Sequence, residues 1–134
     1  AVKTGGASNH RIGLYDMAMI KDNHIEVAGG ITKAVKAVRS KINPGILIEV
    51  ETTTLEQVQE AIDAKADIIM LDNMDTATMK KGVELIAGRA KVEASGNMTL
   101  ERLREVAATG VDYISIGALT HSVSALDISQ RLEN

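Results

Sequence analysis

The sequence predicts an α/β fold, a parallel α/β barrel that is built of successive strand–helix units and is not complete in itself. Two observations predict it: short apolar runs alternate with segments of helical periodicity, and polar side chains follow every one of these runs. With 134 residues, 45% of them hydrophobic and 25% charged, the chain has the size and composition of one globular domain.

Five short runs are predicted as strands because they are almost continuously apolar, as parallel strands covered on both faces are. They recur at near-regular intervals with short loops, so consecutive runs are expected to pair through right-handed strand–helix–strand units. The predicted strands are Met17–Ile20, Ile46–Val50, Ile68–Leu71, Lys91–Ala94 and Tyr113–Ile116.

Each of the five predicted strands is followed by a segment with apolar residues three and four positions apart. This spacing predicts amphipathic helices packed on one side. Pro44 and Gly45 lie beyond the first of them and Gly110 beyond the fourth, where helices commonly end. The predicted helices are Ile31–Lys41, Leu55–Ala64, Ala77–Ala87, Leu100–Ala108 and Val123–Leu132.

Polar residues inside two predicted strands favour a barrel over a doubly wound open sheet. Glu49 and Glu51 share one strand face, as do Lys91, Glu93 and Ser95, because side chains alternate with a period of two. An open sheet between helical layers would bury these groups among apolar side chains, whereas a barrel gathers them in a common interior. Five units are too few for the usual eight-stranded form, so an incomplete TIM-like barrel is expected.

Composition excludes several classes of function. The chain has no cysteine, which rules out disulfides and thiolate chemistry. Its net charge of −3 and its two tyrosines as the only aromatic residues argue against nucleic-acid binding. No apolar run approaches the roughly 20 residues of a membrane span, and no leader-like segment opens the sequence. A cytoplasmic protein without nucleic-acid or membrane partners is therefore expected.

Polar residues at the carboxyl ends of the predicted strands indicate a site for an anionic, phosphorylated substrate, since parallel α/β folds bind ligands at that edge. Glu51 and Asp72 end consecutive strands, and two neighbouring carboxylates repel unless they share a proton or a cation. Oxygen ligands of this kind suit Mg²⁺ together with phosphates. The alternative is a helix-capping Asp72 and a salt-bridged Glu51.

Two turns of small residues, Ser95-Gly96-Asn97 and Gly117-Ala118, directly precede predicted helices. Their backbone N–H groups and the positive end of the helix dipole suit a phosphate group. Glycine that merely permits a tight turn is the alternative for either loop alone. Two such loops on adjacent strands favour phosphate binding.

Cationic side chains near the first predicted strand suit carboxylate groups of a ligand. His10 and Arg11 follow a glycine-rich loop, and Lys21 closes the strand. Arginine offers a planar fork and lysine a point charge, although a single cation is more often a solvated surface group. The histidines His10, His24 and His121 are too scattered for a local zinc motif.

These motifs resemble the quinolinate phosphoribosyltransferase family, also called nicotinate-nucleotide pyrophosphorylase (carboxylating). The resemblance covers essentially the whole chain, in order and with compatible spacings. Its most specific part is Asn-His-Arg followed by Ile-Lys-Asp-Asn-His. The resemblance rests on segments 5–16, 19–25, 49–51, 71–73, 93–96 and 117–122.

The resemblance implies a glycosyltransferase that joins quinolinate to phosphoribosyl pyrophosphate with Mg²⁺ as cofactor and releases carbon dioxide and pyrophosphate. Its product, nicotinate mononucleotide, belongs to de novo NAD biosynthesis. The implied catalytic residues are Lys21, Glu51 and Asp72. The implied binding residues are His10, Arg11 and Lys21 for quinolinate, then Glu51, Asp72, Ser95, Gly96, Asn97, Gly117 and His121 for phosphoribosyl pyrophosphate, with Glu51 and Asp72 also serving Mg²⁺.

The resemblance also implies that residues 1–134 form the C-terminal part of the barrel domain of such an enzyme. The family has an N-terminal domain and a first barrel strand ending in Thr-Arg-Lys-Thr, and this sequence contains neither. Its members act as dimers in which the partner's N-terminal domain completes each site. We therefore expect a homodimer or higher oligomer of the full-length protein and little activity from this chain alone. At position 97 the family usually has glycine, which leaves the contact of Asn97 open.

Three other interpretations remain at this point. A related barrel protein associated with molybdenum transport shares the architecture, but the Asn-His-Arg and Lys-Asp-Asn-His motifs favour quinolinate. An aldolase or isomerase could form a Schiff base on Lys21. The third is a non-catalytic scaffold or assembly piece that binds only phosphate.

Overall fold

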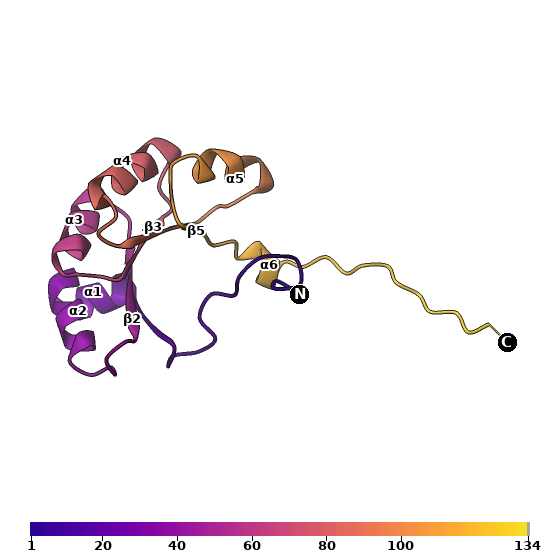
Figure 1. Ribbon diagram of the computed structural model, residues 1–134, viewed down its shortest axis with the longest axis horizontal. Coiled ribbons are helices and arrows are strands. Elements are labelled where there is room, and N and C mark those ends of the chain that lie inside the picture. Colours follow the sequence, from indigo (N-terminus) through magenta and orange to yellow (C-terminus); the bar gives the residue numbers. More distant parts are fainter. Residues whose placement is uncertain (134) are drawn as a thin grey trace.

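A computed structural model describes residues 1–133 of the chain. Five strands form one sheet in the order β1-β2-β3-β4-β5, and every neighbouring pair is parallel. The sheet curves into an arc (Figure 1). Its strands are β1 (Met17–Ile20), β2 (Leu47–Thr52), β3 (Ile68–Asp72), β4 (Lys91–Ser95) and β5 (Tyr113–Ile114).

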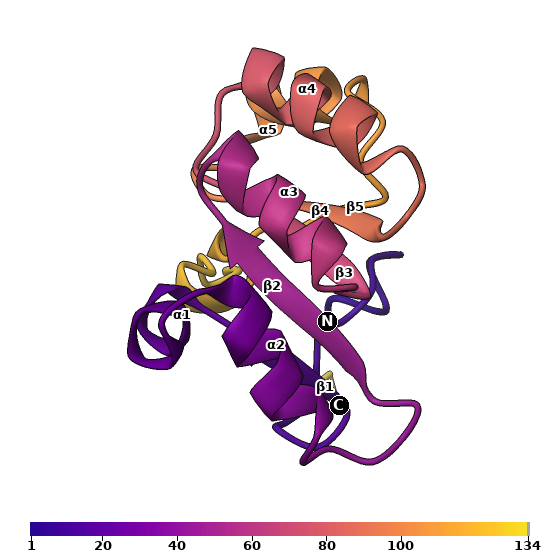
Figure 2. The same cartoon turned by 90° about the vertical axis from the view of Figure 1, so that its left-hand side faces the viewer.

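The helices that connect the strands lie along the outer, convex side of the sheet (Figures 1 and 2). Because the strand order never reverses and the connecting helices share one side, the sheet is singly wound and the predicted α/β barrel fold is confirmed. The helices are α1 (Asp22–Ala28), α2 (Ile31–Arg39), α3 (Leu55–Asp63), α4 (Thr76–Ile86), α5 (Leu100–Ala107) and the short α6 (Ala118–His121).

The main core fills the space between the outer face of the sheet and these helices. Alternate residues of each strand point into it, and the helices contribute the apolar stripes that their periodicity predicts. Its most deeply buried members include Ile20, Ile48, Val50, Ile69 and Leu71 from the strands, and Ile31, Val58, Met79, Ile86 and Val106 from the helices.

The other face of the sheet is mixed, with apolar residues such as Met17, Leu47 and Ile68 beside charged ones. Glu49 is fully buried there and Glu93 is 3% exposed, although glutamate is rarely buried without a partner. The period-two pattern of β2 and β4 places both on the concave side, which is the common interior that the sequence predicts. The barrel therefore has an apolar outer layer and an inner face that carries buried charged groups.

At the edge of the sheet where the strands begin, two aspartates connect neighbouring strands by hydrogen bonds. Asp67 precedes β3, and its carboxylate accepts from the backbone N–H of Ile48 at 2.8 Å and pairs with Arg39 at 2.8 Å. Asp112 precedes β5 and accepts from the backbone N–H of Val92 at 2.8 Å. These contacts fix the register of neighbouring strands, so the charges at this edge are used for structure.

The prediction of a helix at Val123–Leu132 is wrong. Residues 123–133 carry no helix or strand and run away from the body of the molecule (Figure 1). The apolar residues of the predicted stripe are exposed, including Leu126 at 82% and Ile128 at 81%. An isolated helix of this length is marginal, and nothing in the described part of the chain covers its apolar side.

The short helices α1 and α6 have no counterpart among the predicted helices. Both begin directly after a strand-end motif, α1 behind Lys21 and α6 behind Gly117. They are too short to show apolar periodicity, and neither contains a buried residue. Within residues 1–133, none of the helices has the length and apolar character to cross a bilayer.

We predict that Ile69→Ala destabilises the fold by roughly 2–5 kcal/mol, because Ile69 is fully buried in the central strand and its loss leaves a cavity. Urea denaturation followed by circular dichroism measures the change. The matched control is Ile128→Ala in the exposed C-terminal segment, which should stay within about 0.5 kcal/mol of the parent. Equal effects of the two substitutions would contradict the assignment of the core.

Candidate active site

The carboxyl ends of the five strands lie along one rim of the sheet because all five strands are parallel and in near register. On the concave side, a cavity of about 860 Å³ is lined by the segment before β1, by the first residues of β1, β2 and β3, and by residues of β4, β5 and the loop after β5. Among its lining residues are Asn9, His10, Arg11, Glu93 and Gly117. The cavity therefore joins the predicted carboxylate-binding segment to one of the predicted phosphate loops.

An ion pair between Lys21 and Glu51 connects the ends of β1 and β2. The Nζ atom of Lys21 lies 2.9 Å from Glu51 Oε2, and the Glu51 side chain is only 14% exposed. The hydrogen bond to Glu51 raises the pKa of Lys21, and the negative charges of Asp72 and Asp22 add to the effect. Lys21 is thus a cation that three carboxylates at this rim hold in its charged form.

Glu51 and Asp72 are not register partners, although they end neighbouring strands. Glu51 stands opposite Met70, whereas Asp72 stands opposite Ser95 of β4. The Lys21 ammonium group is close enough to both carboxylates to feel their charge. In this arrangement a lysine side chain supplies the cation that a pair of neighbouring carboxylates requires.

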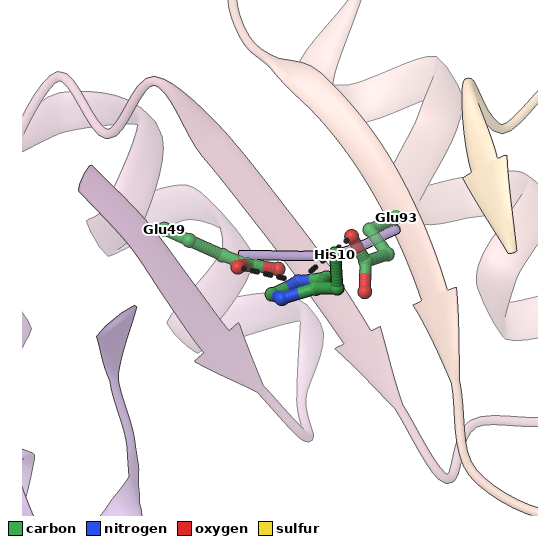
Figure 3. Close-up of side chains that lie close together, drawn as sticks. All are labelled: His10, Glu49 and Glu93. Atoms are coloured by element: carbon green, nitrogen blue, oxygen red, sulfur yellow. Dashed lines mark ion pairs between the residues drawn. The ribbon is translucent and has the colours of Figure 1, made fainter. Parts of the chain in front are cut away.

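A buried cluster lies deeper in the barrel, where His10 reaches between two strands (Figure 3). Its Nε2 atom is 3.1 Å from Glu49 Oε2 on β2 and 3.5 Å from Glu93 Oε2 on β4. The Ser115 hydroxyl donates a hydrogen bond to Glu93 Oε1 at 2.5 Å. The sequence marks both glutamates as inward-facing, but it does not bring His10 to them.

Glu49 is the most perturbed acid of the described chain. Burial raises the pKa of its carboxyl group to about 8, and the neighbouring Glu93 carboxylate adds to the shift. The positive charge of Arg11, whose guanidinium group donates to the carbonyl oxygen of Met17 at 3.4 Å, opposes the shift. Of the three predicted quinolinate-binding residues, His10 thus contacts Glu49, while Lys21 pairs with Glu51 two residues further along the same strand face.

The predicted phosphate loop after β4 is held by the loop after β3. Asn73 Nδ2 donates to Asp72 Oδ2 at 2.7 Å, and Asn73 Oδ1 accepts from Asn97 Nδ2 at 3.1 Å. Asn73 and Asn97 both have positive φ angles, of 54° and 51°, a region that asparagine tolerates. The Asn97 side chain thus links the two loops.

Gly96 has a structural reason to be glycine. Its φ angle is +85°, and a Cβ atom there would lie 2.8 Å from the backbone nitrogen of Asn73 and closer still to its side chain. The close approach and the left-handed conformation both exclude larger residues. Asn73 is thus a residue that the prediction of the site missed, and only its position after Asp72 could have drawn attention to it.

Arg102 on α5 fastens both loops through their backbones. Its guanidinium group donates to the carbonyl oxygens of Met74 at 2.6 Å and Gly96 at 3.1 Å, with a longer contact to Asn97 at 3.5 Å. The planar fork of arginine suits several carbonyl oxygens at once. No sequence pattern pointed to Arg102, because its partners contribute only backbone atoms and one of them, Met74, lies on a different loop.

The second predicted phosphate loop follows β5. The backbone N–H groups of Thr120 and His121 bond to the carbonyl oxygen of Gly117, which closes the short helix α6 on this turn. A Cβ atom at Gly117 would lie 3.0 Å from His121 Nε2, so a larger residue would push the imidazole away. Since β4 and β5 are paired neighbours, the loops that follow them leave the same rim.

The charged groups named so far on the inner side leave no surplus of positive charge. Glu49, whose pKa is raised to about 8, holds its proton at neutral pH, so the sum is 0 with His10 protonated and −1 with it neutral. A site for an anionic ligand needs further positive charge from a metal ion or from other parts of a larger protein. The groups are Glu49, Glu51, Asp72 and Glu93 against His10, Arg11 and Lys21.

The singly wound parallel sheet with its charged concave face defines an α/β-barrel domain of the TIM-like class. A distant solved structure agrees on the fold alone: thiamine phosphate pyrophosphorylase from Pyrococcus furiosus superposes with a TM-score of 0.58 over 75% of this chain, at 22% sequence identity.

The particular family follows from closer comparisons. Residues 1–131 match the family described as quinolinate phosphoribosyl transferase, C-terminal domain, and the chain belongs to this family. The nicotinate-nucleotide pyrophosphorylase of Francisella tularensis superposes with a TM-score of 0.90 at 44% identity, over 96% of this chain and 45% of that one.

Two curated relatives are half identical to the chain. Quinolinate phosphoribosyltransferase (decarboxylating) 2b, mitochondrial, of Nicotiana tabacum is 50% identical over 99% of this chain and 43% of its own length. A probable nicotinate-nucleotide pyrophosphorylase (carboxylating) of Synechocystis is 50% identical over 98% of this chain and 46% of its own length. The chain thus spans less than half the length of the relatives that it matches.

We predict that Glu49 makes the stability of the fold fall as pH rises from about 4.5 to about 8. The pKa of this carboxyl group is raised to about 8 in the folded protein, from an ordinary value of 4.5, so the folded state holds its proton more tightly than the unfolded chain. Glu49→Gln removes the titration. Relative to the parent, this variant should be more stable at pH 9 than at pH 5 by on the order of a few kcal/mol.

Urea denaturation of both proteins at a series of pH values measures this difference. His10, Arg11, Glu51 and Glu93 face Glu49 and stay unchanged in the comparison. Glu105→Gln on the exposed side of α5 is the matched control and should leave the pH dependence of the parent intact. A parallel pH dependence of the parent and Glu49→Gln would refute the assignment.

We also predict that Arg102→Met loosens the loops after β3 and β4 and lowers stability by roughly 1–3 kcal/mol, because their carbonyl oxygens lose a charged donor. Hydrogen exchange followed by mass spectrometry should show faster exchange in residues 73–75 and 95–98. Arg104→Met on the same helix, an exposed position, is the control. Unchanged exchange in both loops of Arg102→Met would contradict the fastening role.

Proposed function

We propose that this chain carries the phosphoribosyl-transfer site of a quinolinate phosphoribosyltransferase, which transfers phosphoribose from phosphoribosyl pyrophosphate to quinolinate with loss of carbon dioxide. The observation that carries the proposal is the grouping of charged and polar residues at the carboxyl ends of the strands. The Lys21–Glu51 ion pair, Asp72 and the Ser95–Asn97 loop lie together there, in a chain that matches the family over residues 1–131.

Quinolinate is a dianion of two neighbouring carboxylates on a pyridine ring, so its pocket needs several cations. We assign this part of the site to His10, Arg11 and Lys21. His10 and Arg11 line the cavity, and Lys21 stands at the end of β1 beside Glu51. His10 and Lys21 each lie beside a carboxylate of the protein, which orients them before a ligand arrives.

Phosphoribosyl pyrophosphate would extend from this pocket along the rim. We assign its 5′-phosphate to the backbone N–H groups of the Ser95-Gly96-Asn97 loop and to the loop of Gly117 and His121. The contacts of Asn73 and Arg102 fix the first of these loops in advance, so little conformational freedom is lost on binding. Glu51 and Asp72 would face the ribose and the pyrophosphate.

The donor set at this rim fits Mg²⁺. Carboxylate oxygens of Glu51 and Asp72 lie at neighbouring strand ends, and Mg²⁺ is usually bound by one or two carboxylates together with substrate phosphates. Bound there, Mg²⁺ would neutralise the pyrophosphate and so favour its departure. It would also add positive charge to an inner side of the barrel that has no surplus of it.

The reaction needs positioning and charge stabilisation more than a nucleophilic side chain. The bond from ribose C1 to pyrophosphate breaks, and positive charge that develops at C1 is stabilised by the Glu51 and Asp72 carboxylates. The quinolinate nitrogen forms the new bond to C1. The C2 carboxylate then leaves as carbon dioxide, its electron pair stays on the cationic ring, and a proton is added at that carbon. Lys21 orients the substrate throughout, because it is fixed to Glu51.

The lack of surplus positive charge inside the barrel supports a proposal about the rest of the protein. We infer that cations from other parts of a longer protein, or from a second subunit, complete the quinolinate pocket, and that the active form is a homodimer or a higher oligomer. We also propose a cytoplasmic location. The names of the tobacco and rice relatives place those proteins in mitochondria and chloroplasts, whereas the name of the Synechocystis relative gives no compartment.

The proposal is tested by grafting this chain into the Synechocystis relative in place of the part that it matches. The chimera should form nicotinate mononucleotide, and Lys21→Met should lower kcat/KM by about 100-fold or more, because the substrate loses a fixed cation. Lys80→Met on the exposed face of α4 is the matched control and should have no effect.

Calorimetry on the isolated chain is the second arm of the test. We expect heat on adding phosphoribosyl pyrophosphate with Mg²⁺, at least about tenfold weaker binding for Asp72→Asn, and no change for Asp127→Asn in the exposed C-terminal segment. Turnover by the isolated chain should be at least roughly 1000-fold below that of the Synechocystis relative. An inactive chimera and no heat with either substrate would leave the non-catalytic interpretation. If borohydride reduction traps a carbonyl substrate covalently on Lys21, the Schiff-base enzyme would be favoured instead.

A further inference from the structure

The Lys-Asp-Asn-His motif ends in a histidine that has no part in the site described above. His24 lies in α1, three residues after Lys21, and it is exposed. Its Nδ1 atom accepts a hydrogen bond from the backbone N–H of Lys21 at 3.0 Å. The last residue of the motif therefore contacts the backbone of the first, which carries the cation that pairs with Glu51.

This contact closes the beginning of α1, because Lys21 occupies the N-cap position of that helix. N-cap residues are commonly Ser, Thr, Asp or Asn, whose side-chain oxygen accepts from an N–H group of the first turn, and lysine has no acceptor atom. Two residues of the first turn supply acceptors instead. Asp22 Oδ1 accepts from the N–H of Asn23 at 2.7 Å, and His24 reaches back to the N-cap N–H as the third residue of a capping box does.

The cap matters for the position of Lys21 because few other contacts fix α1. The helix has seven residues, none of them buried, and helices of this length are marginal by themselves. The preceding strand ends at Ile20, which is only 1% exposed. Lys21 is thus the single residue between a buried strand and a short helix, and the His24 contact fixes its extended backbone from the side of the helix.

The hydrogen bond also determines the chemical state of His24. A backbone N–H group can only donate, so Nδ1 must be the nitrogen without a hydrogen, and the neutral ring carries its hydrogen on Nε2. An imidazolium ion has no free acceptor and could not make this contact. His24 therefore acts here as a neutral acceptor, in contrast to Lys21, which acts as a cation.

We propose that His24 is a positioning residue of the proposed reaction: its Nδ1 atom holds the backbone of Lys21 in the conformation that directs the ammonium group to Glu51 and to the anionic substrate. The inference rests on the proposed role of Lys21. A neutral imidazole suits this position. The glutamate of an ordinary capping box would add a fourth carboxylate to Glu51, Asp72 and Asp22, which already act on Lys21.

The contact is tested by NMR on the chain itself, without substrate. We expect the Nε2–H tautomer of His24 and an observable ¹⁵N signal of the Lys21 ammonium group, because its pair with Glu51 slows exchange with water. His24→Ala removes the acceptor, whereas His24→Gln restores a capping box. In His24→Ala the Lys21 amide should exchange at least about fivefold faster and the ammonium signal should be lost, while His24→Gln keeps both.

The positioning role is tested by kinetics in the chimera with the Synechocystis relative. His24→Ala should lower kcat/KM for quinolinate about tenfold and leave KM for phosphoribosyl pyrophosphate within about twofold, while His24→Gln stays close to the parent. In a chimera that already carries Lys21→Met, His24→Ala should have no further effect, because it acts through Lys21. Ile25→Ala is the matched control: it weakens the packing of α1 on the core, keeps the cap and should leave the kinetics unchanged.

Four results would overturn the proposal: an Nδ1–H tautomer of His24, a failure of His24→Gln to restore activity, an equal loss from His24→Ala in the parent and in Lys21→Met, or an equal loss from Ile25→Ala. In the last case the stability of α1 alone would explain the effect. Circular dichroism confirms that each variant is folded. An inactive parent chimera would count against the proposed reaction itself, and the NMR comparison would then decide whether His24 fixes Lys21.

Discussion

In every strand of this sheet, alternate side chains face the helices and the concave interior, and the parallel register keeps the two sets separate from β1 to β5. The apolar set forms the core, while the other set has no helices to pack against. Carboxylates are tolerated on the concave face because neighbouring strands and the segment before β1 place side chains that can carry positive charge beside them. The Lys21–Glu51 ion pair and the position of His10 between Glu49 and Glu93 both follow from this separation.

The sequence predicted most of the fold because strands and helices of this kind leave local patterns. All five strands and four of the five predicted helices lie where the apolar periodicity placed them, with ends shifted by a few residues. The helix at Val123–Leu132 failed for a physical reason: its apolar stripe requires a surface to cover it, and the described chain offers none. Periodicity shows which residues prefer burial, but it does not show that a partner surface exists.

The site, like the fold, has residues that the sequence could predict and others that it could not. Residues at the ends of strands, such as Lys21 and Asp72, could be predicted because the fold class brings strand ends to one rim. The link from Asn73 to Asn97 and the contacts of Arg102 could not, because they join loops distant in sequence and have no periodic signal. His10 was predicted as a ligand-binding residue, yet its buried neighbours Glu49 and Glu93 were seen only as inward-facing polar positions.

Arg102 holds the Ser95–Asn97 loop by contacts with backbone carbonyl oxygens and with no side chain of that loop. A backbone carbonyl is present whatever residue occupies the position, so these contacts do not depend on the identities of residues 74 and 97. The side chains there have other roles, because Asn97 binds Asn73 and Met74 is buried in the core. A substitution at position 97 would therefore remove the link to Asn73 and leave the attachment of the loop to Arg102 in place.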